Sequence, residues 1–282
     1  MAIVPIVLVL LQFPFAKGHY LVLISFALCS LLLLGNHYFL VGTYGAFCAI
    51  AAFIYESLRR DFHPVKTLMF LGMTLFIVTL LVLHFGGYSS VDFLTKQIKI
   101  MGEQFKAQKD ILLGSQGTQG LEILSLFENP LALAQRIRME FPGYLFVGCF
   151  FMAWINLYMS LKVRQYIVTQ FGRYSDQELL HFRVYDFVIW IVIPLLGLHL
   201  GSEYLQISSY LWIINTLLLV IGVFYFFQGY GILVRLLNRF KIYGLFRTFL
   251  VVSLLTFAWW LVALMGLFDL WINFDRIIQK GE

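Results

Sequence analysis

The chain has 282 residues, of which 61% are hydrophobic and only 12% are charged. A soluble domain of this length needs far more charge to cover its surface, so the composition excludes an ordinary soluble protein. The formal net charge is only +5, and its basic residues gather in short connections, which gives nucleic-acid binding no support. The spacing of the cysteines, Cys29, Cys48 and Cys149, excludes a CxxC metal or redox site, and we expect buried, unreactive thiols.

Long segments without Asp, Glu, Lys or Arg predict helices that span a membrane. About 20 apolar residues in a helix match a hydrocarbon core of about 30 Å, and a helix satisfies its own backbone groups where water is absent. The sequence therefore predicts an all-α fold, a polytopic transmembrane bundle of about eight spans. The expected spans are 1–16, 20–35, 37–57, 67–87, 143–161, 186–203, 209–232 and 246–271.

The first of these spans is short and is interrupted by Pro5 and Pro14. It lacks the basic start and the small-residue cleavage site of a signal peptide. We therefore count it as a span rather than as a leader.

Basic residues occur in every second connection, which predicts the orientation of the bundle because positive loops stay on the cytoplasmic side. The connections 35–36 and 203–208 contain no Lys or Arg. We therefore expect the basic loops on the cytoplasmic side, and segment 88–141 and the C-terminus outside. The basic residues are Arg59, Arg60 and Lys66, then Lys162, Arg164, Arg173 and Arg183, and finally Arg235, Arg239, Lys241 and Arg247.

Segment 88–141 divides the chain into an N-terminal group of spans, 1–87, and a C-terminal group, 142–282. Ser89, Ser90 and Asp92 resemble a helix start. An apolar stripe at helical spacing follows and predicts an amphipathic helix at the outer membrane interface. The stripe consists of Leu94, Ile98, Met101, Phe105 and Leu112.

The glycine-rich stretch 114–120 should end that helix. A second short helix is expected over about 130–140, with Pro142 opening the fifth span. A structural cap over the bundle is one interpretation of this segment. A gate or an element that docks a partner is the other.

Polar residues at membrane depth are functional hypotheses, since burying them costs free energy. His199 follows Pro194 in the sixth span, between Gly197 and Gly201, whose GxxxG spacing permits close helix packing. A broken helix with a histidine near its outer end is typical of a solute pocket. The alternative is a packing kink whose histidine reaches the interface.

The remaining candidates lie in spans five, seven and eight. Asn156, Asn215 and Gln228 are neutral side chains that either bond across helices or bind a ligand. Asp269, Asn273 and Arg276 share one helical face by their spacing. Asp269 is then either part of a terminal ion pair or an acid that lines a pocket.

Motifs of enzymes and cofactor sites are absent from the sequence, which has no HExxH, no GxSxG, no Walker loop and no pair of carboxylates within a span. The other histidines lie near span ends or in loops and predict no metal centre. We therefore expect no catalysis, no cofactor and no metal.

Several short segments resemble the YybS-like family of bacterial multi-pass membrane proteins. They are Arg59–Arg60 with 63–66 (HPVK), 141–144 (FPGY), 182–187 (FRVYDF), 227–231 (FQGYG) and 266–276 (GLFDLWINFDR). This family is grouped with the S components of energy-coupling-factor vitamin transporters. The resemblance implies a helical bundle that binds a small solute and works with a separate ATP-driven module.

Two functions are therefore carried forward. The first is a solute-binding or transport subunit with Asn156, His199, Asn215, Gln228 and Asp269 as candidate site residues. The second is a non-catalytic subunit or scaffold that assembles with another membrane complex. The expected partners are the lipid bilayer, membrane protein subunits and a small-molecule solute, and no nucleic acid. A transport subunit should enclose a partly polar cavity near Asn156, Asn215 or His199.

Overall fold

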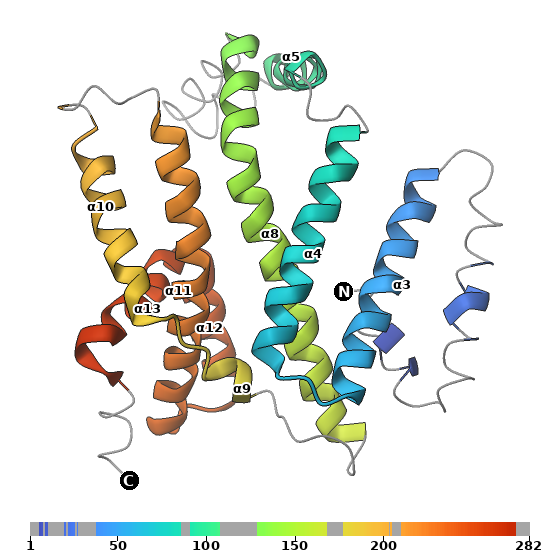
Figure 1. Cartoon of the computed structure of the whole chain (residues 1–282), viewed down its shortest axis with the longest axis vertical. Coiled ribbons are helices and arrows are strands. Elements are labelled where there is room, and N and C mark those ends of the chain that lie inside the picture. The colour runs from blue at the N-terminus through green and yellow to red at the C-terminus, as the bar shows by residue number, and fades with distance from the viewer. Residues whose placement is uncertain are drawn as a thin grey trace. The chain divides into compact units, whose positions relative to one another are not determined.

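The computed structural model describes residues 6–7, 9–10, 20, 22–25, 27, 38–85, 91–107, 129–167, 177–202, 204 and 210–274. These residues form helices and a few turns, and none of them belongs to a β-strand (Figure 1). The prediction of an all-α fold is confirmed over this part of the chain. The helices are α3 (Tyr38–Arg59), α4 (Pro64–Phe85), α5 (Val91–Ala107), α8 (Pro130–Ile167), α9 (Gln177–Leu180), a 3-10 turn (Asp186–Val188), α10 (Ile189–Leu200), α11 (Leu211–Arg239), α12 (Gly244–Phe257) and α13 (Trp259–Ile272).

Three helices among the described residues, α4, α8 and α11, are long and apolar enough to cross a membrane. Helices α12 and α13 add a fourth span if the bent pair counts as one. The expected spans 1–16 and 20–35 lie largely outside the described residues. The number of eight spans and the orientation of the loops therefore stay predictions.

The chain forms two compact units. The first unit comprises Met1–Leu75, Gly148–Trp190 and Ile221–Glu282, and the second comprises Phe76–Val147 and Ile191–Val220. Helices α4, α8, α10 and α11 contribute residues to both units.

The fifth span begins earlier than its sequence suggests. The prediction of a separate short helix over 130–140 was wrong, because α8 continues through Pro142. Proline inside a helix removes one hydrogen bond, and its ring crowds the carbonyl four residues back, at a cost of about 3 kcal/mol. The turn before it is supported by the Arg136 Nε–Glu140 Oε1 ion pair of 3.1 Å. Because α8 continues through Pro142, interactions elsewhere along the helix offset this local cost.

The amphipathic helix predicted after the fourth span is present as α5. Ile98 of its apolar stripe is buried, while Lys96, Lys99 and Glu103 are exposed. Its expected continuation to Leu112 and the stretch 114–120 lie outside the described residues. The position of α5 at a membrane interface stays a prediction.

The sixth span is shorter than expected, because α10 has only 12 residues and so extends about 18 Å. The predicted close packing at its GxxxG motif is not found at Gly197, where a Cβ atom would meet nothing within 4 Å. His199 on the same helix is exposed.

The expected final span, 246–271, is broken rather than continuous. Helices α12 and α13 meet at an angle of 94° (Figure 1). Ala258 separates them with φ −138° and ψ 36°, outside the helical region. Both halves are mostly apolar, and neither glycine nor proline lies next to Ala258, so the sequence contains no clear signal for this break.

The core of the first unit is an aromatic contact between α8 and α11. Trp154 lies 5.5 Å from Phe227 and 4.8 Å from Tyr230, measured between ring centroids. Phe150 packs edge-on against Phe224 at 5.3 Å. Aromatic pairs in these geometries add to the free energy gained by burial, so this contact positions α11 for the site described below.

Arg164 attaches the end of α8 to the turn between α3 and α4. Its guanidinium donates to the Leu58 carbonyl oxygen and to Asp61 Oδ1, both at 3.1 Å, and its side chain is only 5% exposed. Asp61 has a φ of 49°, the left-handed conformation that ends α3. One buried cation thus satisfies a helix-end carbonyl and pairs with a carboxylate.

We expect Arg164→Met to destabilise the protein strongly, because the Leu58 carbonyl oxygen and the exposed Asp61 carboxylate would lose the donor that the buried guanidinium supplies. The apparent melting temperature in detergent should fall by about 5 °C or more. Arg136→Met is the matched control, because its ion pair has the same 3.1 Å distance but its side chain is 73% exposed. Equal losses in the two variants would contradict a special role for the buried pair.

Candidate functional site at the crossing of α11 and α13

Helices α11 and α13 touch through their backbones at two glycines. A Cβ atom on Gly229 would overlap the carbonyl oxygen of Val262, and one on Gly266 would overlap the carbonyl oxygen of Tyr225. Any larger residue at either position would push the helices apart. Glycine is therefore required here for close approach rather than for backbone flexibility.

This close approach brings Gln228 and Asp269 together. Gln228 Nε2 donates to Asp269 Oδ2 at 2.9 Å, and both residues are almost completely buried. Gln228 Oε1 accepts a hydrogen bond from the Val184 backbone N–H at 3.0 Å. We call these two side chains the Gln228–Asp269 cluster.

The second carboxylate oxygen of Asp269 closes the end of α13. Asp269 Oδ1 accepts from the Phe274 N–H at 2.9 Å. The chain can turn back because Asn273 adopts a left-handed conformation, with φ 49° and ψ 68°, and donates its N–H to the Asp269 carbonyl oxygen. Asparagine tolerates this conformation better than most residues.

Asn273 therefore does not continue the helical face that its spacing from Asp269 predicts. The helix ends one residue before it, at Ile272. Arg276, the third member of the predicted face, lies outside the described residues.

A segment between α9 and α10 completes the surroundings of the cluster. Gly231 on α11 lies against the Leu180 backbone, where a Cβ atom would overlap the Leu180 carbonyl oxygen. The same oxygen accepts a hydrogen bond from Arg235 Nη1. These contacts hold the Leu180–Val184 segment across α11 and so place the Val184 N–H at Gln228.

Each polar atom of the Gln228–Asp269 cluster has a partner within the protein, both those of Gln228 and both carboxylate oxygens of Asp269. The cluster joins α11, α13 and the segment before α10. Its chemistry is that of a structural junction, which agrees with the packing interpretation of these residues.

Asn156 differs from the cluster because half of its amide lacks a partner. Its Nδ2 donates to the Met152 carbonyl oxygen at 2.7 Å, whereas its buried Oδ1 has no hydrogen-bond partner among the described residues. Ser160 and Arg164 follow it at intervals of four residues, so a buried polar face runs along α8.

Other buried polar atoms of the first unit share this property. Thr67 Oγ1, Trp154 Nε1 and Tyr225 Oη likewise have no hydrogen-bond partner within the described ranges. Gly72 of α4 faces Phe150 of α8, and Phe76 faces Phe146, so the two helices run antiparallel. This register brings Thr67 to the level of Trp154 and Asn156.

The five predicted site residues thus separate into three groups. Gln228 and Asp269 meet in one cluster, and Asn156 lies in the same unit on α8. His199, which is exposed, and Asn215, which is half-buried, belong to the second unit.

Sequence reasoning missed the partners of these residues. The spacing of Asn156, Ser160 and Arg164 is a signal that could have revealed the polar face of α8. Tyr225 and Gly229 are four residues apart, as are Val262 and Gly266. This spacing occurs on many helix faces, so it does not identify the contact between α11 and α13. The sequence cannot identify the Val184 and Phe274 N–H groups as hydrogen-bond donors to the cluster, because every residue except proline has a backbone N–H group.

The family model described as "Predicted membrane protein (DUF2232)" matches residues 1–270 of the chain. The chain belongs to this family. The match includes all the helices from α3 to α12 and most of α13, so the Gln228–Asp269 cluster lies within it. No curated protein and no solved structure matches the chain. The family supports the prediction of a membrane protein, while the grouping with S components stays a prediction.

We expect Gly229→Ala and Gly266→Ala each to destabilise the protein by about 1–3 kcal/mol, because the added methyl group overpacks a backbone contact. Unfolding of the purified protein in mixed micelles measures the effect. Gly222→Ala is the control on the same helix, since a Cβ atom there meets nothing within 4 Å. It should be neutral or stabilising by up to about 1 kcal/mol. Tolerance of alanine at all three glycines would contradict the close crossing.

We also expect Asp269→Leu to cost about 1–3 kcal/mol, because the Gln228 amide and the Phe274 N–H would be left without an acceptor. The double variant Gln228→Leu/Asp269→Leu should lose less than the sum of the two single variants. Additive losses in this double-mutant cycle would show that the two side chains act independently.

Proposed function

We propose that the chain is a solute-binding or transport subunit of the bacterial cytoplasmic membrane, and that the solute binds at the level of Thr67, Trp154 and Asn156. The observation that carries this proposal is that these three residues each bury a polar atom with no hydrogen-bond partner among the described residues. Each such group costs about 1–3 kcal/mol when it stays unsatisfied. A protein retains that cost where a further molecule satisfies the groups.

The chemistry of the three groups describes the solute. Asn156 Oδ1 accepts a hydrogen bond, Trp154 Nε1 donates one, and Thr67 Oγ1 does either. The neighbouring side chains are aromatic, with Phe150 against α4 and Trp154 against α11. We therefore infer a small solute that has a donor, an acceptor and an apolar part. This chemistry suits the S-component resemblance.

The proposal narrows the set of candidate site residues. Gln228 and Asp269 act in it as the structural junction that positions α11, because their polar atoms are already bonded. His199 and Asn215 have no part in the solute site. The chain acts without catalysis, and its energy source is a separate subunit.

The alternative is a non-catalytic subunit or scaffold that assembles with another membrane complex. The Gln228–Asp269 cluster favours this alternative, because its buried polar atoms bond to the protein itself and so serve packing. Under this alternative, water would satisfy Thr67, Trp154 and Asn156. The two functions thus predict different occupants of the same place.

Purification of the full chain from its native membranes, with mass spectrometry of everything that co-purifies, distinguishes the two functions. If the chain binds a solute, a small molecule should co-purify with it. The bound amount should fall about tenfold in Asn156→Leu and in Thr67→Val, which corresponds to a loss of about 1.4 kcal/mol of binding free energy. Ser160→Ala is the control, since that buried hydroxyl already bonds the Asn156 carbonyl oxygen at 2.7 Å.

Three outcomes decide between the functions. A solute lost in the two variants and kept in the control supports the solute site. Retention of the solute by all the variants would show that it binds elsewhere in the protein. Recovery of a stoichiometric protein partner without any small molecule overturns the proposal in favour of the scaffold.

A further inference from the structure

The buried interior of the first unit holds very little charge. Among the described residues, Arg164 and Asp269 are the only charged side chains that are buried, and both belong to this unit. Both oxygens of the Asp269 carboxylate accept hydrogen bonds within the protein. Arg164 pairs with Asp61 and donates to the Leu58 carbonyl oxygen. The protein itself therefore engages both of its buried charges.

The solute site lies in this interior and adds no charge to it. Thr67, Trp154 and Asn156 are neutral side chains, and each of them offers hydrogen bonds alone. Ser160, the next buried polar residue along α8, is neutral as well and donates to the Asn156 carbonyl oxygen at 2.7 Å. A charged solute would therefore find hydrogen bonds at this place but no counter-ion.

The basic residues nearby do not replace the missing counter-ion. Lys66 adjoins Thr67 in the sequence, but Lys66 is exposed whereas Thr67 is only 4% exposed. Successive residues of a helix point about 100° apart, so the two side chains leave α4 in different directions. Lys162 is exposed too, and Arg235 already donates to a backbone carbonyl oxygen. Water around an exposed charge weakens its attraction for a buried ion.

We propose that the solute is electrically neutral at pH 7. This inference rests on the proposed solute site and narrows the class of molecule that occupies it. Removing an unpaired ion from water costs more free energy than three neutral hydrogen bonds return. A neutral polar group costs far less to bury and is compensated by the same bonds. An alcohol, an amide or a ring N–H group fits the site, whereas a carboxylate, a phosphate or an ammonium group does not.

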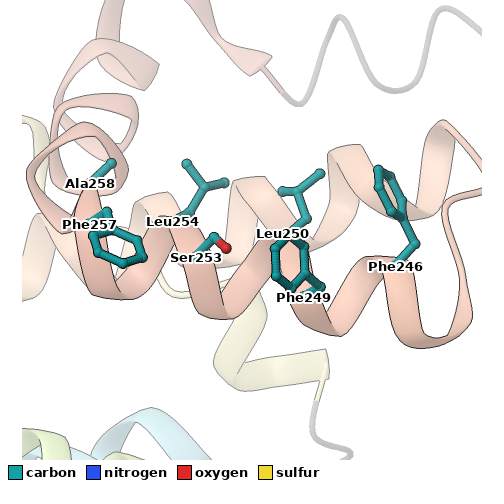
Figure 2. Close-up of a pocket in the computed structure, with 7 residues that line it drawn as sticks. All are labelled: Phe246, Phe249, Leu250, Ser253, Leu254, Phe257 and Ala258. Atoms are coloured by element: carbon teal, nitrogen blue, oxygen red, sulfur yellow. The ribbon is translucent and has the colours of Figure 1, made fainter.

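A groove elsewhere in the first unit supplies no charge either. It runs along α12, has a volume of about 330 Å³, and is apolar apart from the Ser253 hydroxyl (Figure 2). All of its lining comes from α12 and the adjoining Ala258. A solute in this groove would meet one hydroxyl and no counter-ion, so a charged molecule is disfavoured there as well.

The test uses the full chain purified from its native membranes, as wild type, Asn156→Leu and Ser160→Ala. Heat denaturation releases the bound small molecules, which pass over an anion exchanger and a cation exchanger at pH 7 before mass spectrometry. The solute is the molecule whose amount falls about tenfold in Asn156→Leu and stays unchanged in Ser160→Ala. We expect it in the fraction that neither exchanger retains, with no group that is ionised at pH 7 in its structure.

The failure of this inference differs from the failure of the solute site. A molecule that depends on Asn156 but carries an ionised group overturns the neutral solute and leaves the site in place. If no small molecule depends on Asn156, the solute site is wrong and the inference fails with it. Thr67→Val is the second variant, because it replaces a hydroxyl by a methyl group of similar size and identifies the solute if Asn156→Leu does not fold.

Discussion

The contact of α11 and α13 at Gly229 and Gly266 is the constraint on which the rest of the first unit depends. Only this separation lets the short side chain of Asp269 reach Gln228. Gln228 then holds the Val184 N–H, and Asp269 holds the Phe274 N–H at the end of α13. A methyl group at the crossing would therefore weaken a packing contact and also separate the hydrogen bonds that join three parts of the chain.

Two kinds of buried polar residue follow from this arrangement. The polar atoms of Gln228, Asp269 and Arg164 form hydrogen bonds with backbone groups or with other side chains of the protein. Each of these residues joins segments that are distant in sequence. Thr67, Trp154 and Asn156 keep atoms that the described protein leaves unsatisfied. In a medium without water, hydrogen bonding to the rest of the protein separates structural from functional candidates better than residue type does.

Composition and periodicity predicted the elements better than their ends. The apolar segments predicted α4, α8 and α11, because the thickness of the bilayer sets the length of an apolar span. They failed at Pro142, which suggests a helix boundary although α8 continues through it, and at Ala258, where no sequence signal marks a bend. The pairing of Gln228 with Asp269 could not be predicted either, because it depends on two glycines whose partners are backbone atoms.

The break at Ala258 divides one apolar segment into two helices with different surroundings. Helix α13 uses its glycine and its carboxylate to pack against α11, and Val262, Gly266 and Asp269 are buried there. Helix α12 buries none of its residues, although it too is mostly apolar. Hydropathy alone treats both halves as one span. The difference arises from small and polar residues that allow backbone contact in α13, whereas α12 carries large aromatic side chains that hold other helices at a distance and suit contact with lipid chains.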